Sequence, residues 1–140
     1  MWINRIRSMT LEKDGTDLDC VVFGRGDNAL ILIPGLSFQR VKNAAVPLAY
    51  LYRMFAKKYT VYVVDKKDIV PDGYTVREMA GDVAFVMEQL HLRTADVFGV
   101  SQGGMIAQYL AIDYPHLVHK LVLGVTASRK NVVMEEAVSG

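Results

Sequence analysis

The chain has 140 residues, of which 51% are hydrophobic and 22% are charged, and its formal net charge is +1. This balance fits one folded domain and excludes a largely disordered chain. The near-neutral charge gives no reason to expect nucleic acid or an anionic membrane surface as a partner. No apolar stretch reaches the roughly 20 residues of a membrane span, and the N-terminus lacks the long apolar core of a signal peptide. We therefore expect a cytoplasmic protein.

The first third of the chain predicts an antiparallel hairpin followed by a buried strand. Strands are expected at 3–11 and 18–23, because Asp14-Gly15 between them is a hairpin signal. The single cysteine, Cys20, excludes an internal disulfide, and its place in a strand predicts a buried structural thiol. The run 29–33 is apolar without alternation, which is typical of a strand covered by helices on both faces.

The middle of the chain predicts a helix and a further strand. Pro47 can open the helix at its first position. Four apolar residues then recur at helical spacing and should share one buried face: Leu48, Leu51, Tyr52 and Phe55. The next strand is expected at 59–64, ending at Asp65, and a polar loop follows at 66–73.

The last part of the chain alternates helices and strands. Thr75 and Glu78 form a T-x-x-E capping box that opens a helix. Its apolar face is expected to consist of Val76, Met79, Ala80, Val83, Met87 and Leu90. A strand at 95–100, a helix at 102–114 and a strand at 120–125 follow, while 129–140 is polar and shows no strand signal.

This order of elements predicts the α/β class, with a mostly parallel sheet, an N-terminal antiparallel hairpin and helices on both faces. Ligands of such sheets bind beyond the carboxyl ends of the strands. The loops that start near Pro34, Asp65, Ser101 and Thr126 should all lie on that edge.

The sequence Gly99-Val100-Ser101-Gln102-Gly103 has the pattern G-x-S-x-G between a predicted strand and a predicted helix. A serine on such a turn adopts a strained backbone that lifts its hydroxyl clear of the sheet, and Gly99 and Gly103 remove collisions with the neighbouring backbone. Gly104 should give more room still. The new helix points free N–H groups toward the hydroxyl, where an oxyanion would develop. A turn that merely joins strand and helix, or that binds phosphate, is the alternative; the standard phosphate-loop patterns are missing.

The hairpin, the strand ending in a glycine-containing loop and the strand–serine–helix unit together resemble the α/β-hydrolase fold. Residues 99–111, Tyr114-Pro115 and 121–123 look like the small esterase and peptidase-like branch of that family. The similarity runs from the first strand to about Ser128. It implies that Ser101 is the nucleophile and that the backbone N–H of Gln102 is one oxyanion donor.

The resemblance also implies a second oxyanion donor in the loop after the third strand. The family pattern His-Gly-x reads Pro34-Gly35-Leu36 here, so the N–H of Leu36 matches that donor and the histidine is missing. Ser37 or Phe38 would be the donor if the loop turns differently. The expected pocket residues are Gly35, Ser37, Phe38 and Met105.

A serine hydroxyl needs a base within hydrogen-bond reach. Three histidines are available, His91, His116 and His119, but each follows a helix and should lie at the edge opposite Ser101. We interpret Asp65 as structuring a loop or forming a pocket wall rather than as the triad acid. Longer relatives continue with a lid and two further strands. The resemblance therefore implies a truncated hydrolase core at 1–128, lacking the last two strands, and the start of the lid region at 129–140.

Two hypotheses follow. The first is a serine hydrolase that cleaves an ester, thioester or small amide through an acyl-enzyme at Ser101, with acid and histidine supplied from elsewhere, so that the isolated chain is inactive or impaired. The second is a catalytically incomplete binding or assembly module, or one half of a split enzyme. In either case the apolar strand 120–125 would form an exposed edge, which predicts a homo-oligomer or a complementing C-terminal chain.

No cofactor or metal is expected. The sequence has no H-E-x-x-H pattern and no Cys/His cluster at ligand spacing. His116-x-x-His119 is an isolated pair, which we interpret as part of a solvated turn. Nucleic acid is not indicated either, since no basic groove accompanies the aromatic residues.

Overall fold

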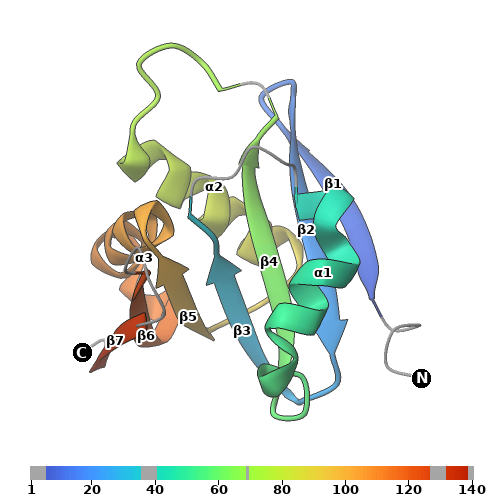
Figure 1. Ribbon diagram of the computed structural model, residues 1–140. Helices are drawn as coiled ribbons and strands as arrows, with labels where there is room; N and C mark the ends of the chain where they lie inside the picture. Colours follow the sequence, from blue (N-terminus) through green and yellow to red (C-terminus); the bar gives the residue numbers. More distant parts are fainter. Residues whose placement is uncertain (1–5, 36–40, 69, 127–131, 139–140) are drawn as a thin grey trace.

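The computed structural model describes residues 6–35, 41–68, 70–126 and 132–138 (Figure 1). Its centre is a seven-stranded sheet with the strand order β1-β2-β4-β3-β5-β6-β7. The strands are β1 (Arg7–Lys13), β2 (Thr16–Gly24), β3 (Asn28–Ile33), β4 (Tyr59–Lys67), β5 (Ala95–Val100), β6 (Val118–Thr126) and β7 (Val132–Val138). The helices are α1 (Ala45–Leu51), α2 (Val76–Gln89) and α3 (Gln102–Asp113), with 3-10 turns at η2 (Val41–Ala44), η3 (Arg53–Phe55) and η4 (Pro115–Leu117).

The α/β class predicted from the sequence is confirmed. Strands β4, β3, β5 and β6 form a parallel centre. Antiparallel pairs flank it: β1 with β2, β2 with β4, and β6 with β7. Over the residues that the structure describes, no helix has the length and apolarity needed to cross a bilayer.

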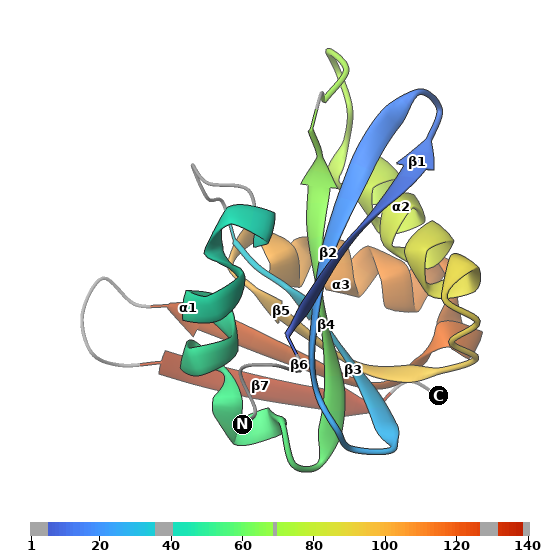
Figure 2. The same ribbon diagram turned by 90° about the vertical axis from the view of Figure 1, so that its right-hand side faces the viewer.

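The two faces of the sheet bury separate cores. Within β3, Ile31 and Ile33 pack with α2 and α3, whereas Leu30 and Leu32 pack on the face covered by α1. Figure 2 shows α1 on one side of the sheet and α2 on the other. Successive residues of a strand point to opposite faces. Because both faces of β3 are covered by helices, its residues are apolar on both sides and the sequence shows no alternation.

Several local predictions are confirmed at the hairpin and at α2. Asp14 and Gly15 both have positive φ angles, 53° and 79°, as a two-residue hairpin turn requires. Thr75 and Glu78 form the complete capping box at the start of α2, with each side chain bonded to the backbone of the other residue. All six predicted apolar residues of this helix pack into the core shared with α3.

Helix α1 differs from its prediction in two ways. It begins at Ala45, after a 3-10 turn, so that Pro47 is its third residue; the first N–H groups of a helix have no partner inside it, so proline costs no bond there. The buried stripe contains Ala49, and Leu51 is 58% exposed. The stripe is rotated from the predicted one because Ala45, Leu48, Ala49 and Tyr52 pack on the sheet.

The prediction that residues 129–140 form no strand was wrong, because β7 (Val132–Val138) pairs antiparallel with residues 120–126 of β6. Strand β6 is therefore an interior strand of this sheet, and the exposed edge expected at 120–125 does not exist. The polar loop expected at 66–73 also starts later. Lys66 and Lys67 extend β4, where Lys67 pairs with Leu18.

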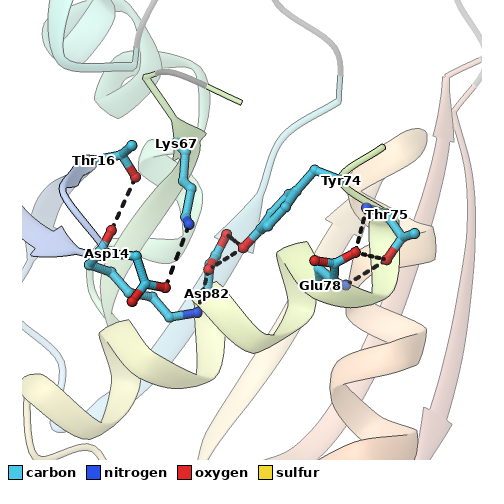
Figure 3. Close-up of polar contacts among 8 residues, drawn as sticks. Asp14, Thr16, Lys67, Tyr74, Thr75, Glu78 and Asp82 are labelled. Atoms are coloured by element: carbon cyan, nitrogen blue, oxygen red, sulfur yellow. Dashed lines mark hydrogen bonds and ion pairs between the residues drawn. The ribbon is translucent and has the colours of Figure 1, made fainter. Parts of the chain in front are cut away.

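A buried polar cluster fixes the hairpin to α2 (Figure 3). The carboxylate of Asp82, on α2, accepts hydrogen bonds from Lys13 Nζ at 2.7 Å and from the Tyr74 hydroxyl at 2.8 Å. The buried Lys67 ammonium lies 4.8 Å from the centre of the Tyr74 ring and 3.9 Å from Asp14. Burial, and secondly the bond to Asp82, raise the pKa of Tyr74 above its usual range. The cluster thus anchors the end of the loop that leads into α2.

Candidate active site

The connection between β5 and α3 is a single strained residue. Ser101 has φ 54° and ψ −119°, a region that non-glycine residues enter only at a cost of about 1–3 kcal/mol. Its backbone is held on both sides, since its N–H donates to the Gly124 carbonyl at 3.0 Å and its carbonyl accepts from Gly104 at 2.9 Å. The strand, the tight bend and the helix therefore lie where the G-x-S-x-G pattern predicts them.

The two glycines of the motif are needed for close backbone approach. A Cβ atom at Gly99 would collide with the carbonyl of Gly103, and one at Gly103 would collide with the carbonyl of Ile33. Gly104 differs from its prediction, because a Cβ there would meet its nearest atom, the Gly99 oxygen, at an ordinary 3.5 Å. Only the two glycines flanking Ser101 in the pattern are required by packing.

The Ser101 residue is exposed, and its side chain does not cap α3. Gln102 is the first residue of α3, so its backbone N–H has no acceptor within the helix. On the other side lies Gly35, whose Cβ position would be 3.1 Å from Ser101 Cβ and 3.7 Å from Oγ. The loop after β3 thus starts directly beside the serine. Leu36, Ser37 and Phe38 lie outside the described residues.

The carboxyl end of β4 contacts Val41, which follows the loop after β3, and Gln102, which follows the serine. The Asp65 carboxylate accepts hydrogen bonds from the backbone N–H of Val41, at 2.9 Å, and of Lys66, at 2.8 Å. It therefore ties β4 to the chain just after residues 36–40, in agreement with a loop-structuring role. Lys66 Nζ lies 3.5 Å from Gln102 Oε1, a long contact that the sequence did not predict.

A small cavity lies next to this site. It has a volume of about 20 Å³ and is bordered by Gly35, Asp65, Lys66 and Asp82, among others. A space of this size holds about one water molecule and no acyl group. Met105, predicted as a pocket residue, is 53% exposed on the first turn of α3.

The three histidines lie far from Ser101 along the sheet. His119 is the second residue of β6 and His116 lies in the turn before it, while His91 follows α2 and precedes β5. Since β5 and β6 are parallel, all three are at the amino ends of these strands. Asp96 is five residues before Ser101, which corresponds to about 16 Å of extended chain. His119 Nδ1 lies 2.9 Å from Asp96 Oδ1 at that distant end.

Two further expectations concern metals and the thiol. Among the residues that the structure describes, no group of three or more His, Cys, Asp or Glu side chains could hold a metal ion. Cys20 is fully buried in β2, and burial raises the pKa of its thiol to about 12. The prediction of a structural thiol is confirmed.

The sequence model of the α/β hydrolase fold matches residues 45–139. The chain is 25% identical over 125 residues to 3-oxoadipate enol-lactonase 2 of Acinetobacter baylyi, an alignment covering 86% of this chain and 45% of the relative. Among solved structures, it superimposes on ALR0039 of Nostoc sp PCC 7120 with a TM-score of 0.71 at 27% identity, covering 88% of this chain and 43% of that one.

A further solved structure is Est816, described as an N-acyl homoserine lactone degrading enzyme; its TM-score is 0.67 at 28% identity, covering 79% of this chain and 42% of that one. The chain thus spans less than half the length of these relatives. The family model covers more than half of the chain, and the relatives are described as an enol-lactonase, a putative alpha/beta hydrolase and a lactone-degrading enzyme. The chain belongs to the α/β hydrolase fold family.

Proposed function

We propose that this chain carries the nucleophile and the oxyanion donors of a serine hydrolase that cleaves an ester, thioester or small amide. The observation that supports this most directly is the backbone of Ser101. A non-glycine residue at φ 54° is held there by two hydrogen bonds and two obligatory glycines, and its side chain is left exposed. Strain of this kind persists where the surrounding structure imposes it, often at functional sites.

In the proposed reaction, Ser101 Oγ adds to the substrate carbonyl carbon and its proton passes to a base. The carbonyl oxygen becomes an oxyanion, which the N–H groups of Gln102 and Leu36 stabilise. The alcohol, thiol or amine then leaves with a proton, and water hydrolyses the acyl-enzyme. The base and the acid come from outside this chain's described residues, either from a longer form of the protein or from a complementing C-terminal chain.

The ester class is favoured by the relatives. An enol-lactonase and a lactone-degrading enzyme both act, by their names, on cyclic esters. Gly35, at the start of the loop after β3, lies beside Ser101, which supports a donor from this loop, and the family resemblance assigns that donor to Leu36.

A specific observation favours the second candidate, a catalytically incomplete binding or assembly module. All three histidines lie at the opposite end of β5 and β6 from Ser101. Without a base, only the oxyanion donors and binding would remain for catalysis.

A fluorophosphonate probe tests the proposal, because it reacts covalently with an activated serine. We expect labelling, of the chain alone or of the chain with a second polypeptide that supplies histidine and acid, that is lost in Ser101→Ala and kept in Ser8→Ala, which removes another exposed serine, on β1. Labelling that appears only when a second polypeptide supplies histidine and acid would support a split enzyme. No labelling of the protein under either condition would contradict a hydrolase and leave the binding module.

A further inference from the structure

A hydrogen-bonded cluster occupies the amino edge of the sheet, away from Ser101. The Asp96 carboxylate, on β5, accepts a hydrogen bond from the Tyr59 hydroxyl at 2.6 Å on one oxygen. Its other oxygen lies 2.9 Å from His119 Nδ1. Tyr59 is the first residue of β4, so the cluster joins three strands and crosses the start of β3.

This geometry fixes how the imidazole of His119 is presented. A carboxylate only accepts hydrogen bonds, so Nδ1 carries the proton and donates it to Asp96. Nε2 is then directed away from Asp96. The His119 side chain is 64% exposed, whereas that of Asp96 is only 14% exposed. The ring is therefore anchored on one side and open to a ligand on the other.

A cavity of about 310 Å³ lies over this cluster. That volume is at the lower end of the range of small-molecule sites. Besides Tyr59, Asp96 and His119, the cavity is lined by two lysines, Lys58 and Lys120. The ammonium group of Lys58 lies 5.7 Å from the centre of the Tyr59 ring, which places its charge beside the cluster.

We propose that this cavity binds a small oxyanion, a phosphate or carboxylate group, between Lys58 and Lys120 and beside the ring of His119. A cation would face the two lysines of the cavity, and an apolar ligand would gain nothing from their charges. The carboxylate of Asp96 opposes the anion, but its side chain is only 14% exposed and the two lysines of the cavity outweigh its single negative charge. An oxyanion matches the two lysine ammonium groups, which supply both positive charge and hydrogen-bond donors. The site is separate from Ser101 and does not depend on the proposed hydrolase activity.

The test follows the His119 ring resonances by NMR while inorganic phosphate or acetate is added at constant pH and ionic strength. His119→Gln assigns the signal, and His91, which does not line the cavity, is the internal reference. We expect a saturable shift of His119 alone. Saturation with phosphate only, or with acetate only, identifies the class of anion. Absence of saturation for both by about 20 mM, well above a millimolar dissociation constant, would overturn the proposal.

Matched lysine variants separate a site from general attraction to a positive surface. Lys58→Ala and Lys120→Ala should each weaken binding about fivefold, and Lys58→Arg should restore most of the affinity. Lys57→Ala removes the same charge one residue away, outside the cavity, and should leave binding unchanged. An equal loss in Lys57→Ala would show that only net charge matters, and the site would be rejected. Circular dichroism of each variant verifies that the fold is intact.

Discussion

Strand β5 has Asp96 as its second residue and is followed directly by Ser101, and its two ends differ in strain, packing and chemistry. The carboxyl end has a serine in a strained backbone, between glycines that admit no side chain. The amino end has an unstrained Asp96–His119 pair and an open cavity above it. An aspartate–histidine hydrogen bond and an activated serine belong to one catalytic unit in serine hydrolases. Here the pair and the serine are separated by the length of β5.

The difference teaches that residue types alone do not define a catalytic site. His119 has the same kind of carboxylate partner that orients a catalytic histidine, but it lies at the sheet edge where α/β ligands do not normally bind. Ser101 lies at the edge where they do. Changes at the carboxyl end should therefore affect the fold and the serine together, whereas changes at the amino end should affect local bonds only.

The largest effect is expected at Gly103. Gly103→Ala places a Cβ against the Ile33 carbonyl, so the bend must open, and we expect a loss of about 3 kcal/mol or more in unfolding free energy. Gly104→Ala is the matched control. It meets only ordinary contacts and gains helix propensity, so its stability should stay within about 1 kcal/mol. Urea denaturation of both variants measures the difference, and equal losses would show that the bend is not tightly packed.

A smaller effect is expected at Asp65. Asp65→Ala leaves the N–H of Val41 without this acceptor, which should cost about 2 kcal/mol. If the loop after β3 supplies an oxyanion donor, fluorophosphonate labelling of Ser101 should also become slower. Asp65→Asn keeps one acceptor oxygen and should recover part of both losses.

The control for Asp65 is Asp72→Asn, which changes an exposed residue of the loop before α2. We expect no change in stability or labelling rate. Unchanged labelling in Asp65→Ala, together with a clear loss of stability, would show that the Asp65 carboxylate stabilises the fold but does not affect the reactivity of Ser101.

The sequence predicted the carboxyl end of β5 better than the amino end, for a physical reason. The bend at Ser101 is specified by neighbours in the chain, since Gly99 and Gly103 stand two residues to either side. The Tyr59–Asp96–His119 cluster joins residues 23 and 37 positions apart. Strand order and register alone bring them together. A usable signal was that Asp96 and His119 are each the second residue of neighbouring parallel strands.

The same reasoning explains why the sequence did not predict strand β7. Strand β7 contains Glu135 and Glu136, which oppose strand prediction. It forms a strand through backbone pairing with β6, over the register from Lys120–Val138 to Thr126–Val132. Edge strands tolerate charged residues because part of their surface faces solvent. The prediction for this segment followed its low strand propensity, whereas the structure follows its backbone pairing with β6.

The packed centre of the sheet between the two ends can be probed through Cys20. The thiol of the unfolded chain loses its proton near pH 9.0, whereas burial in the folded chain raises the pKa to about 12. The contribution of Cys20 to unfolding free energy is therefore constant below pH 9 and falls above it by about 1.4 kcal/mol per pH unit. Cys20→Ala should remove this slope between pH 9 and 11. At pH 8, a disulfide reagent should modify the thiol only in the unfolded protein, and rapid modification of the native protein would show that the centre opens.

The smallest effect is expected at the amino end, in Tyr59→Phe. This change deletes the hydroxyl that bonds Asp96 but keeps the aromatic ring, which packs edge-on against Phe55 at 6.4 Å. Asp96 is partly exposed, so water can replace the lost donor, and we expect a cost of about 1 kcal/mol. Tyr50→Phe, on exposed α1, should cost nothing measurable. The labelling rate of Ser101 should be the same in both variants as in the parent chain. A slower rate in Tyr59→Phe alone would show that the two ends of β5 are coupled, because the hydroxyl of Tyr59 contacts Asp96, and Ser101 lies five residues, or about 16 Å, farther along the chain of β5.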